Sequence, residues 1–138
     1  MRRAMLFVLA AALALGFAML HRAGSAPAGL AHATCPDLTR GCAIGTPGHP
    51  VRVRFSHRPS ALAPVDLEVV APSVRQAQAQ FSMVGMDMGP NRYRLLPMGP
   101  GRFVGHILLP ACVAGRSDWI LTLDLDGRRT AIPFSATP

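Results

Sequence analysis

The sequence contains no lysine, a single glutamate, and only one tryptophan and one tyrosine. All fourteen basic residues are therefore arginines, against seven acidic residues. The arginines are scattered along the chain, and aromatic residues do not alternate with them as they do in proteins that bind single-stranded nucleic acid. An alanine-rich, all-arginine composition is more typical of GC-rich coding than of a binding surface. We therefore expect a solvated, moderately basic surface and no nucleic-acid partner.

Motifs on which common catalytic sites are built are also missing. The sequence has no glycine-rich phosphate loop, no nucleophile elbow and no HExxH pair. Ser56 and His57 are neighbours, but within an expected strand adjacent side chains point to opposite faces. Glu68, the single glutamate, falls in the middle of another expected strand. These absences favour a protein that is not an enzyme and has no small-molecule substrate.

One long apolar run, from Ala4 to Leu20, lies at the N-terminus behind Arg2 and Arg3. At about seventeen residues it is just long enough to span a bilayer. It is either a signal peptide or a membrane anchor, and its cleavage sites fit poorly, so we favour an uncleaved signal anchor over residues 1–22. Because positive charge precedes the run, the rest of the chain is expected to be exported. The predicted location is the bacterial inner membrane with the C-terminal domain in the periplasm, or the periplasm alone if the segment is cleaved.

Export makes the three cysteines informative, because oxidising compartments permit disulfides. Cys35 and Cys42 enclose a short turn-like segment, and Cys112 stands alone downstream. The spacing fits neither a CxxC redox motif nor a structural zinc site. We expect a disulfide involving two of the three, with the pairing open. A thiol-reactive protein that uses Cys112 is a further hypothesis, although nothing near it in the sequence would activate the thiol.

Beyond the N-terminal run, residues 23–49 show no periodicity and are expected to form a linker that carries Cys35 and Cys42. Residues 50–138 are expected to form one domain. Short alternating runs there predict seven strands, at 51–57, 65–71, 75–84, 92–98, 101–110, 118–127 and 128–136. Spacing of about ten residues predicts an all-β fold, a small immunoglobulin-like β-sandwich of about seven antiparallel strands.

The expected core of this sandwich is aromatic and leucine-rich. In the run 118–127, Trp119 shares one face with the leucines at 121, 123 and 125. Phe103 is expected to pack in the same core, together with Phe55 and Phe134. A turn is expected at the Asp-Gly pair 126–127.

Methionines are the feature that a core explains least well. Beyond the N-terminal run there are four, all within sixteen residues. Thioethers hold Cu(I) well and hard cations badly. Met86 and Met88 are two apart in a glycine-flanked segment and therefore point the same way, which makes them the preferred ligand pair. The other candidate donors are Met83, Met98, His106 and Cys112.

Alternatives remain for several of these donors. Met83 continues the face of Phe81 and is either a core residue or a third ligand that a bend at Gly85 brings round. His106 lies in an apolar run, which is more typical of a partly buried structural histidine. The whole methionine group is alternatively a set of gap fillers in an irregular core.

The run VGMDMGPNRYRL, followed by GRFVGHILLPACVAGRSDWILTL, resembles exported proteins of the YtkA-like family and FixH-type proteins. The resemblance covers about residues 50 to 136. Such proteins are small, often membrane-anchored, immunoglobulin-like domains linked to copper delivery or oxidase assembly. The resemblance implies Met86 and Met88 as metal ligands and Trp119 as a core residue. The chain lacks the H(M)xnM…HxM arrangement of better-known periplasmic copper chaperones, so the pattern leaves the ligand set incomplete.

Together these features predict a membrane-tethered periplasmic protein that binds Cu(I) and assists copper delivery to, or assembly of, a membrane metalloenzyme such as cytochrome c oxidase. The expected partners are the membrane, through the N-terminal helix, and that metalloenzyme or another copper protein. The alternative is a metal-free periplasmic assembly or interaction module that uses its methionine-rich turn as a contact surface.

Overall fold

The computed structural model describes residues 29–46, 48–86, 89–111 and 115–137. These residues form ten strands and no helix, so this part of the chain offers no helix able to cross a membrane. The expected anchor, residues 1–22, lies outside the described residues. The all-β prediction is confirmed for the part that is described.

The seven predicted strand regions all contain strands. They are β3 (His49–Phe55), β4 (Pro64–Val70), β5 (Ala77–Met83), β6 (Arg92–Arg94) with β7 (Leu96–Pro97), β8 (Arg102–Leu108), β9 (Asp118–Leu125) and β10 (Arg128–Ser135). Two further strands are β1 (Ala31–His32) and β2 (Cys42–Thr46). Both lie within the range predicted as a linker, so that prediction is wrong for residues 31–46. Only Ile44 of β2 is buried, which is too few apolar positions to produce a visible alternation.

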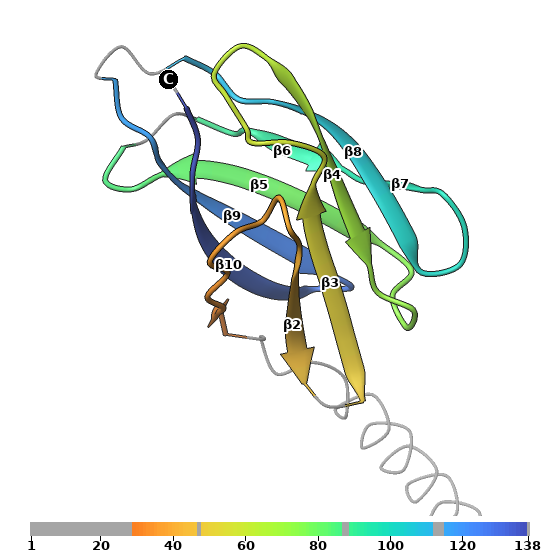
Figure 1. The fold of residues 1–138 in the computed structure, drawn as a ribbon. Coiled ribbons are helices and arrows are strands. Elements are labelled where there is room, and N and C mark those ends of the chain that lie inside the picture. The colour runs from red at the N-terminus through yellow and green to blue at the C-terminus, as the bar shows by residue number, and fades with distance from the viewer. Residues whose placement is uncertain (1–28, 47, 87–88, 112–114, 138) are drawn as a thin grey trace, which may run out of the picture.

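The strands form two five-stranded sheets that face each other as the layers of a β-sandwich (Figure 1). Sheet A has the order β1-β10-β9-β5-β6, and sheet B has the order β2-β3-β4-β8-β7. Neighbouring strands are antiparallel except β1, which runs parallel to β10. The expectation of purely antiparallel strands is therefore wrong at this one edge, because β1 and β10 are far apart in the sequence and no hairpin joins them.

Alternate residues of each strand fill the space between the sheets. On β9 the buried face carries Trp119, Leu121 and Leu123, as predicted. Phe103 is buried as well, also as predicted. These side chains come from both layers, so the core depends on the two sheets stacking.

An aromatic cluster joins the layers at the centre of the core. Phe55 of sheet B has its ring centroid 6.4 Å from that of Phe81 and 5.3 Å from that of Phe134, both in sheet A. Phe55 and Phe81 are almost completely buried. Full burial of one such side chain stabilises a fold by about 1.5–3 kcal/mol.

The strand predicted over residues 92–98 passes from one sheet to the other. Its first part, β6, pairs with β5 in sheet A, and its second part, β7, pairs with β8 in sheet B. Between them Leu95 is 3% exposed and packs against Gly105, where an added Cβ would lie 2.5 Å from Leu95 Cδ2. The Tyr93 hydroxyl also bridges the sheets, because it donates to the Leu108 carbonyl at 2.7 Å.

The sandwich has two ends that matter for the site. At the first, β5 ends and β9 begins, and the described loop residues 84–86, 89–91, 109–111 and 115–117 lie there; we call this end the methionine pole. There the Val84 N–H donates to the Asp118 carbonyl at 3.3 Å. At the opposite pole the turns 71–76, 98–101 and 126–127 meet, with Ala71 N–H donating to Gly101 O and Asp126 N–H to Gln76 O.

Candidate metal centre

The methionine segment begins as a tight turn at the end of β5. The chain passes through Val84 and Gly85, so that Met86 forms an antiparallel bridge with Met83. Met86 N–H lies 3.4 Å from the Met83 carbonyl oxygen. Gly85 has a φ of 72°, a conformation that glycine adopts at little cost. The predicted bend at Gly85 is confirmed.

Met83 and Met86 differ in their surroundings. Met83 is only 3% exposed and belongs to the core, so the core alternative holds for it. Met86 is partly buried and packs against the same core. Packing therefore accounts for part of the environment of Met86. Met88, the other half of the predicted pair, lies outside the described residues.

Met98 lies far from this turn. It is 64% exposed and forms part of the hairpin between β7 and β8, where its N–H donates to the Arg102 carbonyl. That hairpin lies at the pole opposite to the methionine pole, since the neighbouring Gly101 bonds to Ala71. A strand the length of β5 spans about 20 Å, so Met98 is not brought to the Met83–Met86 turn.

His106 is on the outer face of sheet B, whereas Met83 faces the core from sheet A. Its side chain is 79% exposed, and its Nδ1 contacts the carboxylate of Asp66, the residue opposite it on β4. The expectation of a partly buried histidine is wrong, because alternation in β8 directs the flanking Gly105 and Ile107 inward and His106 outward. His106 is therefore not brought together with the methionines.

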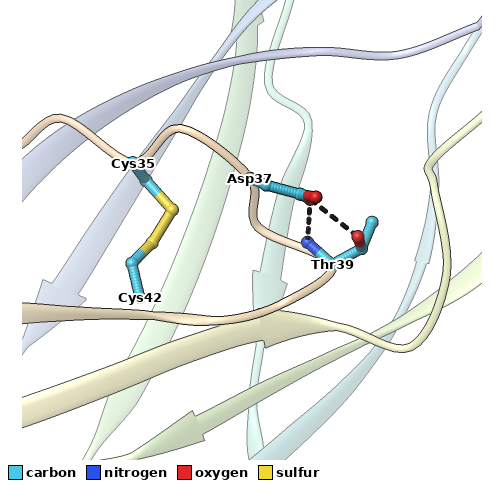
Figure 2. The surroundings of a disulfide bond; sticks show 4 residues. All are labelled: Cys35, Asp37, Thr39 and Cys42. Carbon is cyan, nitrogen blue, oxygen red and sulfur yellow. Dashed lines mark hydrogen bonds between the residues drawn. A yellow bond between two sulfur atoms is a disulfide. The ribbon is translucent and has the colours of Figure 1, made fainter.

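Two of the three cysteines are joined. Cys35 and Cys42 form a disulfide with a Cα–Cα distance of 5.9 Å (Figure 2). The loop between them is held by Asp37, whose Oδ1 accepts from the Thr39 N–H at 2.8 Å and from the Thr39 hydroxyl at 2.6 Å. These two bonds, the hydroxyl bond first, lower the pKa of the Asp37 carboxyl. Cys112 lies outside the described residues.

The loops that contain the remaining soft donors start from the same pole. Residues 87–88 follow the Met83–Met86 turn, and residues 112–114 lie between β8 and β9. The roots of these loops are linked by the Val84–Asp118 bond and by the Tyr93 hydroxyl, which donates to the last residue of β8. Strand pairing thus brings two segments together that are about 25 residues apart in the sequence.

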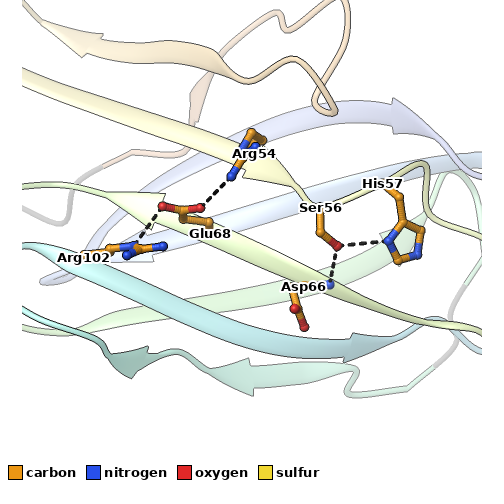
Figure 3. Close-up of polar contacts among 6 residues, drawn as sticks. All are labelled: Arg54, Ser56, His57, Asp66, Glu68 and Arg102. Atoms are coloured by element: carbon orange, nitrogen blue, oxygen red, sulfur yellow. Dashed lines mark hydrogen bonds and ion pairs between the residues drawn. The ribbon is translucent and has the colours of Figure 1, made fainter.

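Ser56 and His57 are arranged differently from the sequence expectation. Strand β3 ends at Phe55, so the two residues lie in a bend and not in a strand. Their side chains hydrogen-bond, Ser56 Oγ to His57 Nδ1, at 3.0 Å, and Ser56 Oγ accepts from the Asp66 N–H at 3.2 Å (Figure 3). The prediction that they point to opposite faces is wrong because it assumed a longer strand.

A polar cluster on sheet B was not predicted from the sequence. Glu68 pairs with Arg54 at 3.0 Å and with Arg102 at 2.9 Å (Figure 3). Strand alternation over residues 51–55 puts Arg52 and Arg54 on one outward face. Nothing local indicated that β8 would add Arg102 from the other side.

Among the described residues no group of three or more His, Cys, Asp or Glu side chains is arranged to hold a metal ion. The copper hypothesis relies instead on thioether sulfurs. Comparison with models of known protein families, with curated proteins and with solved structures found no match for this chain. The resemblance to YtkA-like and FixH-type proteins stays a prediction.

Proposed function

We propose that this chain is an exported, membrane-tethered accessory protein of immunoglobulin-like type that binds Cu(I) at its methionine pole. It assists copper delivery to, or assembly of, a membrane metalloenzyme such as cytochrome c oxidase. Met86 and Met88 supply thioether ligands, and Cys112 supplies the thiolate that the methionine pair needs. Met83, Met98 and His106 are left out of this set because of their positions.

One observation carries the ligand set: the roots of the methionine turn and of the loop containing Cys112 are hydrogen-bonded together at one pole. The Cys35–Cys42 disulfide supports it further, since neither of those cysteines is then available to pair with Cys112. A disulfide also fits an oxidising compartment outside the cytoplasm. The tether itself rests on the apolar run at residues 4–20.

The proposed mechanism is ligand exchange. The thioethers of Met86 and Met88 are soft donors that need no deprotonation, whereas Cys112 binds only as a thiolate, so the affinity for Cu(I) falls where that thiol is protonated. Met86 lies in the turn that follows β5 and is only partly buried. A partner thiolate or imidazole can then displace the two thioethers one at a time and finally the Cys112 thiolate, which takes up a proton when it is released. The copper ion passes on without a change in oxidation state.

The test is a Cu(I) titration of the full chain in detergent micelles against a competing chelator. Replacing Met86 and Met88 together by leucine is expected to lower the affinity by about tenfold or more, because two of three soft donors are lost. Cys112→Ser is expected to have a similar effect. Met98→Leu is the matched control, since Met98 is exposed at the opposite pole, and it should bind as the wild type does.

If the wild type and the double variant bind Cu(I) equally poorly, the copper proposal fails. The second candidate is then a metal-free interaction module, and a specific feature favours it. Beside the methionine turn lies a hollow lined by Leu38, Trp119, Phe134 and Val84, and Val84 is 44% exposed. In that case Val84→Asp should abolish binding to the assembling enzyme. The Met86/Met88 double variant and Cys112→Ser should still bind that enzyme.

A further inference from the structure

Three arginines come together on the outer face of sheet B. Strand pairing places Arg52 of β3 and Arg102 of β8 on either side of Val70 in β4. One row along, Arg54 lies directly opposite Glu68. Residues that are 50 positions apart in the sequence therefore share one patch, which we call the arginine patch and define as these three arginines with Glu68.

Glu68 is the only carboxylate within this patch, and it is engaged on both sides. Its Oε2 accepts from Arg54 at 3.0 Å, and its Oε1 accepts from Arg102 at 2.9 Å. The hydrogen bond from Arg54, followed by the charge of Arg102, lowers the pKa of the Glu68 carboxyl. Glu68 therefore stays ionised over the physiological range and balances a single positive charge.

The patch keeps a surplus of positive charge. Three arginines against one carboxylate leave a formal charge of 3 − 1 = +2. Arg52 forms no ion pair with any other residue that the structure describes. Arg54 and Arg102 are about half exposed, at 55% and 54%, so their guanidinium groups can be reached from solvent.

A hollow lies beside the patch. It is lined by Arg52, Arg54 and Glu68 together with small residues of the edge segment, Gly41 and Ala43, and by Arg40 at its rim. Guanidinium groups in this setting can donate two parallel bonds to a carboxylate.

We propose that the arginine patch is a docking site for an acidic segment of a partner protein, with Arg52 as its open anchor. The surplus charge and the exposed guanidinium forks are complementary to carboxylates. A carboxylate-bearing segment is favoured as the ligand because two of the guanidinium groups already hold one carboxylate, that of Glu68, between them. This inference does not depend on copper binding.

The test uses the full chain in uncharged detergent and a fluorescent hexaglutamate peptide, with binding measured by anisotropy at low and at 0.15 M salt. Arg52→Glu is expected to weaken binding at least about fivefold, which corresponds to one surface ion pair. Glu68→Gln is expected to tighten binding, because it releases Arg54 and Arg102 from their internal partner. The matched control is Arg94→Glu, an exposed arginine on β6 of sheet A that changes the net charge equally.

The possible results distinguish a specific peptide-binding site at the arginine patch from a general attraction between a basic protein and an acidic peptide. Tighter binding by Glu68→Gln and an effect of less than about twofold from Arg94→Glu support the proposal. Equal losses in Arg52→Glu and Arg94→Glu overturn it, since only net charge would then matter. Binding to phosphatidylglycerol vesicles, but not to the peptide, also overturns it, because the ligand would be a membrane surface. Circular dichroism checks that each variant is folded.

Discussion

Asp126 is the first residue of the two-residue turn between β9 and β10. Its φ is 49°, and that of Gly127 is 86°. Positive φ at both positions suits the twist of an antiparallel hairpin, and the sequence pair Asp-Gly predicted this turn correctly. The Asp126 carboxylate also accepts from the N–H groups of Arg75 at 3.0 Å and Gln76 at 2.9 Å. One side chain therefore ties the last hairpin to the start of β5.

These bonds make the stability of the fold depend on pH. The N–H of Arg75, followed by that of Gln76, lowers the pKa of the Asp126 carboxyl below its ordinary 3.8. A lowered pKa means that the stabilisation is complete above pH 3.8 and is lost as the pH falls through the value in the folded state. We expect Asp126→Asn to be less stable than the wild type at pH 7 and to lose less stability on acidification. Urea unfolding at pH 7 and at pH 3 measures the stability of both proteins. If the wild type and Asp126→Asn lose the same stability between pH 7 and pH 3, the Asp126 carboxylate is not the source of the pH dependence.

Met83 and Met86 show how differently two neighbouring methionines can be buried. Met83 and Met86 are adjacent in space, yet Met83 is a core residue and Met86 lies at the rim of that core. Alternation along β5 predicted the first because Met83 continues the inward face of Phe81. The position of Met86 depends on the turn at Gly85 and could not be read from a strand pattern.

At the scale of elements, the hairpin between β7 and β8 depends on one close approach. Gly101 has a φ of 65°, and a Cβ there would lie 2.4 Å from the Pro72 Cα, a backbone atom that cannot easily move. Its carbonyl also accepts the Ala71 N–H at 2.6 Å. The turn at 71–73 and the hairpin are therefore packed backbone against backbone.

We expect Gly101→Ala to lower the free energy of unfolding for two reasons. An alanine is strained at this positive φ, and its methyl group would also collide with Pro72. The collision alone should cost about 1–3 kcal/mol, because the contact is already filled. Gly85→Ala is the matched control, since Gly85 has a similar φ of 72° and open space around it. Chemical denaturation of both variants measures the difference. Equal decreases in the free energy of unfolding for Gly101→Ala and Gly85→Ala would show that the close contact with Pro72 has no effect on stability.

Edge elements were the least predictable part of the fold. β1 and β2 are short and carry few buried residues, so the segment 31–46 resembled a linker. The split of the strand at 92–98 was missed for a related reason. Leu95 is buried because Gly105, on a strand ten residues away, leaves room for it, and a sequence pattern does not show such a neighbour.

At the scale of the whole molecule, the disulfide attaches the N-terminal segment to the sandwich. Cys35 is buried, and the loop that it closes contains Leu38, whose carbonyl accepts the Phe55 N–H at 2.9 Å. The loop is thereby connected to the aromatic cluster at the centre of the core. We infer that the disulfide stabilises the packing of β2 at the edge of sheet B.

Replacing Cys35 and Cys42 together by serine is expected to destabilise the domain by about 2–3 kcal/mol, through the greater freedom of the unfolded chain. Thermal unfolding of the oxidised wild type and of the double variant measures this loss, and a reducing agent should affect only the wild type. Cys112→Ser is the control and should unfold as the wild type does. A strong loss in that control would mean that Cys112 contributes to the fold.

Local alternation was sufficient to predict where the strands lie, which face of β9 is buried and where the last hairpin turns, because these features depend on residues one or two positions apart. Which side chains meet across the molecule depends on the order of the strands, and that order is set by packing between segments far apart in the chain. Pairing of β3, β4 and β8 turned scattered arginines into one patch around Glu68. Pairing of β8 with β4 and β7 keeps His106 and Met98 away from the methionine turn. Pairing of β5 with β9, together with the Tyr93 hydroxyl, brings the roots of two loops to one pole.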